Sequence, residues 1–275
     1  MKFDAPLVMG VLNVTPDSFS DGGQHFEFDF ALIHAREMMA QGADIIDVGG
    51  ESTRPGADRI SPDEEERRVL SVIETLVADG ATVSIDTMNA STARAAIAAG
   101  AKIINDVSGG LADPEMFGVA AASGATLIIS HWRGFSDIMD TQNSYNDVAR
   151  DVTAELQVRV DAALAAGVSR DKLVIDPGLG FAKDLKQNWQ LVARLDALES
   201  LGLPILVGAS RKRFIAGVIE PDAPAEADNN RRDVATAVLT ALLLQRKMWG
   251  VRVHNVQLTR DTIRVVAALR EGEQS

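Results

Sequence analysis

Cysteine is absent from the 275 residues of this sequence. A disulfide framework, a cysteine-ligated zinc or iron–sulfur centre and a thiol nucleophile are therefore excluded. Histidine is scarce as well, since the chain holds only His25, His34, His131 and His254. This scarcity disfavours an imidazole-rich transition-metal site, so any bound metal is expected to be a hard, oxygen-ligated ion such as Mg²⁺.

The chain carries fewer positive than negative charges. It has 27 lysines and arginines and 39 aspartates and glutamates, which gives a net charge of −12. A chain of this charge repels phosphates over most of its surface, which disfavours nucleic acid and anionic membranes as partners. No run of 18 uncharged apolar residues occurs, and the first residues lack the pattern of a signal peptide. We therefore expect a cytoplasmic protein without a membrane-spanning segment.

Eight short apolar segments alternate with helical patterns along the chain. The strand-like segments cover 6–14, 43–49, 81–87, 101–107, 125–131, 172–178, 204–210 and 249–256. The helical patterns cover 27–41, 61–79, 91–99, 114–122, 146–166, 184–200, 230–248 and 258–272. Eight βα units predict an α/β fold of the (β/α)₈ TIM-barrel class, with residues 1–275 as a single domain. A doubly wound Rossmann sheet would require an early G-x-G-x-x-G turn, which the sequence lacks.

Polar residues recur at the C-terminal ends of the predicted strands. They are Asn13, Asp47, Asp86, Asn105, Asp106, Asp176, Ser210, Arg211, Lys212, Arg213, Arg252 and His254. These strand ends converge on one face of a barrel, where active sites of this fold lie. Unrelated solvated charges would be scattered over both ends, so the pattern indicates an enzyme.

Carboxylates and amides follow the middle strands. Asp86 and Asp176 could each accept two parallel hydrogen bonds from a ligand, and Asn105 can both donate and accept. Such groups suit a flat heterocycle with an amidine-like edge, such as a guanine or a pterin. An aspartate at a strand end can instead cap the next helix. We favour this structural role for Asp47 and Asp106.

Basic residues follow the second strand and the last two strands. Arg54 comes after the second strand, Lys212 after the seventh, and Arg252 and His254 belong to the eighth. The loops after strands seven and eight often bind phosphate in this fold, so the cluster predicts an anionic substrate group. A merely solvated basic run is less favoured, because the helix dipole opposes cations at a helix start. Arg211 and Arg213 flank Lys212 and are candidates for ion pairs alone, and His131 is compatible with either packing or a site.

Eight motifs lie in register at these strand ends. They are MGVLNVTPDSFSDGG (9–23), DVGGESTRPGA (47–57), SIDT (84–87), INDVSGG (104–110), SHWRG (130–134), IDPGLGFAK (175–183), GASRKRF (208–214) and RVHNV (252–256). Together they resemble the dihydropteroate synthase family of pterin-binding TIM barrels, in its actinobacterial form. The resemblance runs in order over residues 6–256.

The resemblance implies a homodimeric transferase of folate biosynthesis and a target of sulfonamides. The family joins 6-hydroxymethyl-7,8-dihydropterin diphosphate to p-aminobenzoate and releases pyrophosphate. By resemblance, Asp86, Asn105, Asp176, Lys212 and Arg252 hold the pterin, while Asn13, Arg54, Arg252 and His254 receive the diphosphate, with Mg²⁺ at Asn13. Phe19, Thr53, Arg54, Pro55, Lys212 and Arg213 would border p-aminobenzoate. Asp86, Lys212, Arg252 and His254 are the implied catalytic residues.

The chemistry of the substrates favours a dissociative substitution. The arylamine is a weak nucleophile, so catalysis gains most from stabilising the departing diphosphate and the methylene cation. The chain departs from the usual family pattern at Ser130, Arg213 and Asn255, where many members have Met, Ser and Asp. Asn255 could alter the orientation of His254.

Two alternatives stay open from the sequence. One is a catalytically silent paralogue that binds a pterin. The other is a barrel of the methyltetrahydrofolate:corrinoid methyltransferase type, which shares the pterin-reading residues but needs no diphosphate site. The basic residues after strands seven and eight argue against this second alternative.

Overall fold

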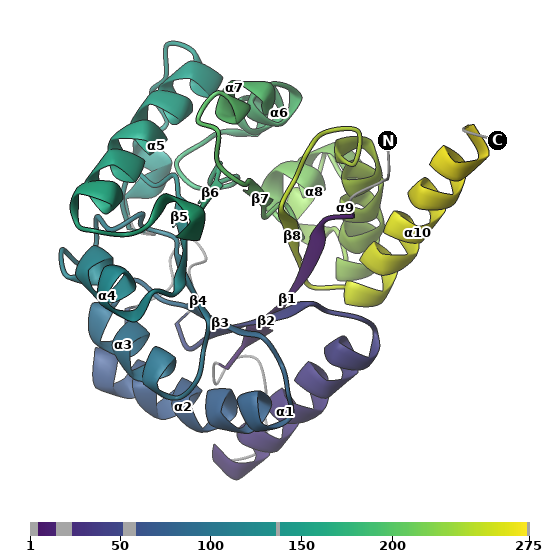
Figure 1. Cartoon of the computed structure of the whole chain (residues 1–275). Helices are drawn as coiled ribbons and strands as arrows, with labels where there is room; N and C mark the ends of the chain where they lie inside the picture. Colours follow the sequence, from purple (N-terminus) through teal and green to yellow (C-terminus); the bar gives the residue numbers. More distant parts are fainter. Residues whose placement is uncertain (1–4, 15–23, 52–58, 136–137, 274–275) are drawn as a thin grey trace.

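Eight parallel strands form a ring at the centre of the molecule (Figure 1). The structure, a computed structural model, describes residues 5–14, 24–51, 59–135 and 138–273. Its strands are β1 Leu7–Asn13, β2 Ile45–Gly49, β3 Val83–Asp86, β4 Ile103–Asp106, β5 Thr126–Ser130, β6 Leu173–Asp176, β7 Leu206–Val207 and β8 Gly250–Val253. The sheet order is β6-β5-β4-β3-β2-β1-β8-β7, and a parallel bridge between Ile175 and Ile205 joins its two edges. The predicted (β/α)₈ barrel is confirmed.

Helices surround the strands on the outside (Figure 1). Within the described ranges they are α1 Gln24–Ala40, α2 Pro62–Ala78, α3 Ala90–Ala98, α4 Met116–Ser123, α5 Val148–Ala165, α6 Leu185–Ala193, α7 Asp196–Glu199, α8 Arg213–Ile219, α9 Asn229–Leu243 and α10 Val256–Glu273, with short 3₁₀ turns at Met139–Thr141, Arg170–Lys172 and Pro224–Glu226. No helix in this part of the chain is long and apolar enough to cross a membrane.

Three local predictions differ from the structure. The helical pattern at 184–200 divides into α6 and α7, because the backbone leaves the helical region at Arg194, at φ −119° and ψ 35°. The short helix α8 was not predicted. It begins after Arg211, whose left-handed φ of 60° turns the chain out of β7. Strand β8 ends at Val253, so His254 lies in the turn before α10 rather than on the strand.

Alternation along the strands places the polar residues above an apolar layer. The inside of the barrel is filled by Met9, Ile45, Ile103, Ile128, Val174 and Leu206. Side chains two residues apart on a strand point the same way. Asp47, Asn105 and Asp176 each follow one of these apolar residues by two positions, so they face the barrel axis at its C-terminal end. A larger apolar cluster lies between the strands and the helices and supports the ring from outside.

Candidate active site

Arg252 lies at the centre of a buried charge cluster at the C-terminal end of the strands. Its Nε donates to Oδ2 of Asp47 and its Nη2 donates to Oδ2 of Asp86, both over 2.6 Å. Asn105 also donates to Oδ2 of Asp47, over 3.0 Å. The cluster therefore joins β2, β3, β4 and β8 above the apolar layer. Asp47 orients both Arg252 and Asn105, a role that the sequence did not suggest.

The second carboxylate oxygen of Asp86 has no partner among the described residues. This atom, Oδ1, is buried, and so is Oδ1 of Asp47. Burial raises the pKa of Asp86 to about 7, against the effect of Arg252 and with a contribution from the charge of Asp47. Buried acceptors are normally hydrogen-bonded in folded proteins. These oxygens are therefore suited to a ligand that brings N–H groups.

Arg252 stays charged and keeps donors for a ligand. Burial lowers its pKa, but Asp47 and Asp86 outweigh that effect, so the pKa is raised above the ordinary value. A guanidinium has five N–H donors. Within the described residues, the hydrogen bonds of this side chain use one donor for Asp47 and one for Asp86. The remaining donors can meet an anion.

Asp176 and Lys212 form the opposite side of the site. Oδ1 of Asp176 accepts a 2.7 Å hydrogen bond from the backbone N–H of Gly178. The ammonium of Lys212 donates to the carbonyl of Leu179 and lies 4.6 Å from the centre of the Phe181 ring. Burial lowers the pKa of Lys212 to about 8, opposed by the charge of Asp176. Burial also raises the pKa of Asp176, opposed by Lys212.

His254 is held by Ser210, which follows β7. The hydroxyl of Ser210 lies 3.0 Å from Nδ1 of His254 and accepts a 3.1 Å hydrogen bond from the His254 backbone N–H. This contact brings the turn after β8 against the turn after β7. The residue as a whole is half-buried.

Arg211 is held away from the site by α9. Its guanidinium donates to both carboxylate oxygens of Asp233, over 2.7 and 2.8 Å. This bidentate ion pair holds the left-handed turn that precedes Lys212. Arg213 is exposed at the first position of α8.

Two glycines leave space at the level of the charged groups. A Cβ at Gly49 would lie 3.5 Å from Cβ of Asp86, and a Cβ at Gly208 would lie 3.4 Å from Oδ2 of Asp176. Each glycine lies two positions after an inward-facing residue, Asp47 or Leu206, and so faces the barrel axis, where it leaves space that a larger side chain would fill. Asn13 ends β1 opposite Gly49 and is half-buried.

The other predicted residues divide into three groups. Phe19, Thr53, Arg54 and Pro55 lie outside the described residues. Asp106 forms a turn by accepting hydrogen bonds from Ser108 and Gly110, as expected for a structural aspartate. Ser130 is buried at the end of β5 and His131 is buried beside it, within a network that includes Lys183. The sequence did not single out Lys183 or Asp233, because both act on loops rather than from strand ends.

Comparison with known proteins identifies the family. Residues 9–254 match the family of pterin binding enzymes. The dihydropteroate synthase of Mycobacterium leprae is 49% identical over 273 residues, covering 98% of this chain and 96% of the relative. A solved dihydropteroate synthase of Xanthomonas albilineans with 4-aminobenzoic acid superposes with a TM-score of 0.89 at 40% identity, covering 98% of this chain and 94% of that one.

A second structure of the Xanthomonas albilineans enzyme, in complex with 7,8-dihydropteroate, has a TM-score of 0.86 at 37% identity and covers 98% of this chain and 95% of that one. The similarity in sequence and in structure extends over nearly the whole length of both partners. It includes every described strand end that carries a predicted site residue. This chain belongs to the dihydropteroate synthase family of pterin-binding enzymes, which are transferases of folate biosynthesis.

Proposed function

We propose that this chain joins 6-hydroxymethyl-7,8-dihydropterin diphosphate to p-aminobenzoate, forming 7,8-dihydropteroate and pyrophosphate. The observation that supports the proposal most is the buried cluster of Asp47, Asp86 and Arg252 facing Asp176 and Lys212. It combines acceptors for a heterocycle with donors for an anion. A relative of the same fold has been solved with 4-aminobenzoic acid, and again with 7,8-dihydropteroate.

The pterin would lie between the two carboxylates. The free Oδ1 of Asp86 and the carboxylate of Asp176 accept from ring N–H and amino groups, and Asn105 supplies an amide. A carboxylate that accepts two parallel hydrogen bonds fixes the plane of a flat ligand. Lys212 would donate to a pterin oxygen or nitrogen, and the guanidinium of Arg252 would lie over the pterin ring.

The diphosphate would be received by Asn13, Arg252 and His254, together with Arg54. Arg252 keeps its charge at any working pH, so it stabilises negative charge on the leaving oxygen. Ser210 fixes the position of the His254 ring. These donors increase the reactivity of the electrophile rather than that of the amine.

Mg²⁺ is part of the proposal as an ion that accompanies the diphosphate. The described residues contain no group of three His, Asp or Glu side chains that could hold a metal. Mg²⁺ commonly keeps several waters and binds through one or two protein oxygens plus substrate phosphates. The amide oxygen of Asn13 fits that donor set. When bound, the ion would neutralise charge on the departing diphosphate.

The proposed reaction is a dissociative substitution. The bond between the methylene carbon and the diphosphate oxygen breaks, and its electron pair leaves with the diphosphate. The amine of p-aminobenzoate then forms the C–N bond and loses a proton to solvent. Lys212 and Arg213 would border p-aminobenzoate, with Phe19, Thr53, Arg54 and Pro55 completing that side. The reaction needs neither a covalent intermediate nor a strong general base, and we place it in the cytoplasm.

Pyrophosphate release tests the proposal. Purified protein is given the pterin diphosphate and Mg²⁺, with and without p-aminobenzoate. We expect pyrophosphate release that depends on p-aminobenzoate and is inhibited by a sulfonamide. Release should be lost in Arg252→Ala. Arg264→Ala, which removes an exposed arginine, is the matched control and should release pyrophosphate as the wild type does. Pterin binding without p-aminobenzoate-dependent release would identify a silent paralogue and overturn the proposal.

The proposal includes a homodimer formed through α9 and α10. Val234, Val238 and Leu242 are spaced four residues apart on α9, and each is more than half exposed. Val265 and Leu269 repeat this spacing on α10 and are also exposed. The two helices pack against each other (Figure 1), so their apolar residues can form one surface. A contiguous apolar surface of this kind is typical of a protein–protein interface.

A further inference from the structure

Lys183 is a buried cation that the proposed reaction does not use. Its side chain follows β6 and is 8% exposed. The ammonium donates to the carbonyls of Gly178 and Phe181, each over 3.0 Å, and lies 2.9 Å from Nδ1 of His131. Burial lowers the pKa of Lys183, but three acceptors favour the ammonium form, which has one proton for each.

His131 connects Lys183 to a carboxylate on α5. Nε2 of His131 lies 2.9 Å from Oε2 of Glu155. Burial lowers the pKa of His131 to about 4, with the charge of Lys183 adding to the effect, so the ring is neutral at pH 7. A proton on Nε2 allows the ring to donate to Glu155 while Nδ1 accepts from Lys183. The neutral imidazole thus satisfies both neighbours.

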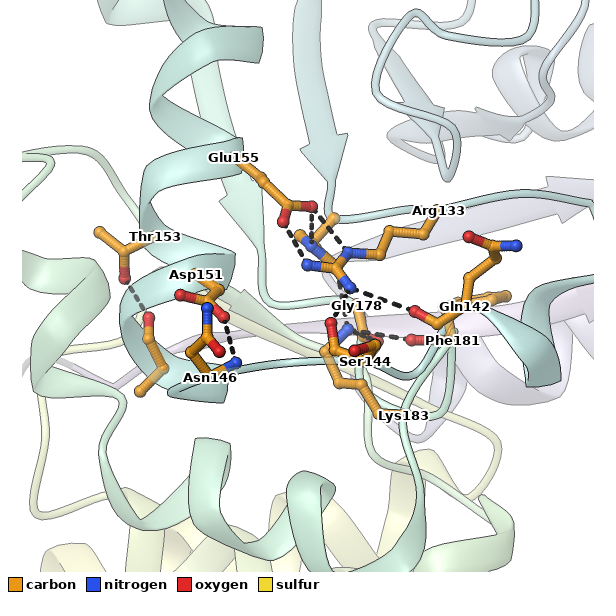
Figure 2. A network of polar contacts seen from close by, with 12 residues as sticks. Arg133, Gln142, Ser144, Asn146, Asp151, Thr153, Glu155, Gly178, Phe181 and Lys183 are labelled. Carbon is orange, nitrogen blue, oxygen red and sulfur yellow. Dashed lines mark hydrogen bonds and ion pairs between the residues drawn. The ribbon is translucent and has the colours of Figure 1, made fainter.

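Arg133 fixes Glu155 in turn. Figure 2 shows Arg133 between the carboxylate of Glu155 and the carbonyls of Gln142 and Ser144. Its Nε donates to Oε2 of Glu155 over 3.0 Å, and its Nη1 donates to Ser144 over 2.7 Å. The chain of contacts therefore runs from the segment before α5, through Glu155 and His131, to Lys183.

The loop held by Lys183 also forms one side of the site. Gly178 and Ala182 have left-handed φ values of 66° and 49°. A Cβ at Gly178 would lie only 2.0 Å from the carbonyl oxygen of His131, so the loop packs closely on the end of β5. The same loop donates to Asp176 from Gly178 and accepts from Lys212 at Leu179. Movement of this loop would displace both Asp176 and Lys212.

We propose that Lys183 is a positioning residue that holds the loop between β6 and α6 in the shape that orients Asp176 and Lys212. Glu155, acting through His131, orients Lys183. This inference rests on the proposed function, because it assigns Lys183 a place in the same reaction. It predicts a measurable change at Lys212, which Lys183 does not touch.

That change concerns the protonation of Lys212. The charged groups that face Lys212 are Asp176 on β6, Asp86 on β3, Arg252 on β8 and Lys183 in the loop after β6, and burial is the largest influence on its pKa. The loop covers the ammonium with Leu179 and Phe181. If the loop loosens, water reaches the ammonium and the pKa of Lys212 rises from about 8 toward its ordinary value of 10.5.

The test compares Lys183→Met with Lys186→Met, which removes an exposed lysine three residues further along the chain. The pH profile of kcat/KM is measured for the holoenzyme with both substrates and Mg²⁺, and pterin affinity is measured separately by fluorescence. We expect Lys183→Met to lose about tenfold in kcat/KM at pH 7, as misplaced groups do. We also expect the basic limb of its profile to move upward by about one pH unit as Lys212 becomes hydrated. Lys186→Met should match the wild type.

Glu155→Gln provides a second variant in case Lys183→Met does not fold. The side chain of Glu155 is 41% exposed, so we expect this substitution to leave the fold intact. Its basic limb should move in the same direction by a smaller amount. A reduced melting temperature with an unchanged basic limb in both variants would overturn the inference and leave Lys183 a purely structural role. A wild-type protein that binds pterin without turnover would instead refute the proposed function.

Discussion

The Nε of Arg252 donates a hydrogen bond to the carboxylate of Asp47, a side chain with no exposed surface. The same oxygen of Asp47 also accepts from Asn105. One buried carboxylate on β2 thereby orients two of the proposed pterin-binding residues, which lie on β4 and β8 and are separated in the sheet by three strands. Asp47 itself need not touch a ligand to control how ligands bind.

Replacing Asp47 with Asn should therefore weaken both the fold and the site. In this variant Arg252 keeps its ion pair with Asp86 alone. The new side-chain amide also sets N–H donors beside the N–H donors of Arg252 and Asn105. Breaking a buried ion pair from one side costs about 3–5 kcal/mol, and we expect the lower end because Asp86 remains. Urea denaturation measures the stability, and pterin fluorescence measures the affinity. The exposed Asp222→Asn is the control, and wild-type affinity in Asp47→Asn would contradict the role given to Asp47.

The ionisation of Asp86 should make stability fall as the pH rises. Its folded pKa of about 7 is above the ordinary 3.8, so the folded state binds this proton more tightly than the unfolded state does. The contribution of the protonated group is present below about pH 4 and is lost as the pH rises to about 7. Asp86→Asn removes this dependence. As the pH rises from 4 to 8, the melting temperature of the wild type should fall relative to that of Asp86→Asn. A difference in melting temperature that stays constant over this range would refute the assignment.

Pterin binding should show a maximum between about pH 7 and 8. Asp86 is a full acceptor only when ionised, above its pKa of about 7. Lys212 donates a charge-assisted hydrogen bond only when protonated, below its pKa of about 8. A fluorescence titration across this range measures the affinity. Binding in Asp86→Asn should lose the acidic limb and keep the basic one, and an unchanged acidic limb would exclude Asp86 as its cause.

A charge on the apolar surface of α9 should prevent dimer formation. Val238 lies between Val234 and Leu242 and is 58% exposed, so Val238→Glu leaves the barrel core untouched. We expect the wild type to be a dimer and the variant a monomer by light scattering after gel filtration. Val158→Glu on α5 makes the same change at an equally exposed valine and should leave the dimer intact. A dimeric Val238→Glu would exclude this surface as the interface.

The strand ends could be predicted from the sequence because alternation and turn residues are local properties. Asn105 and Asp176 follow apolar residues at a spacing of two, Asp86 ends β3 at the matching position, and the barrel necessarily brings the three to one face. The pairing of Arg252 with Asp47 could not be predicted in this way. It joins residues 205 positions apart, and its selection over other carboxylates depends on the closed ring.

Loop conformation was the least predictable part. The helix α8 depends on a left-handed Arg211 held by Asp233 from α9, and the loop after β6 depends on Lys183. Asp233 belongs to another element, and so does His131, which contacts Lys183 from the end of β5. Secondary-structure propensity and hydrophobic periodicity depend on neighbours along the chain, so they do not predict contacts between elements. A lysine within an apolar segment, as in GFAK (180–183), is the one local hint that Lys183 is buried.

Asn255 is the departure from the family pattern that the structure explains most directly. Its Oδ1 accepts from the backbone N–H of Leu258 over 3.0 Å and so caps α10, and its Nδ2 donates to Oδ2 of Asp233 over 3.4 Å. Asp233 is buried and is already bound by Arg211. The side-chain hydrogen bonds of Asn255 thus go to Leu258 and Asp233, whereas the imidazole of His254 lies against Ser210.

Replacing Asn255 with Asp should therefore change stability more than turnover. Asp caps a helix as well as Asn does, but it would set a second carboxylate against Asp233. We expect a loss of about 1–2 kcal/mol at pH 8 that shrinks at pH 5, as the new carboxyl takes up a proton. Asp233→Asn should remove most of this penalty in a double-mutant cycle, because the repulsion needs both charges. Urea denaturation at the two pH values measures it. A large drop in kcat with unchanged stability would instead show that position 255 acts on His254 after all.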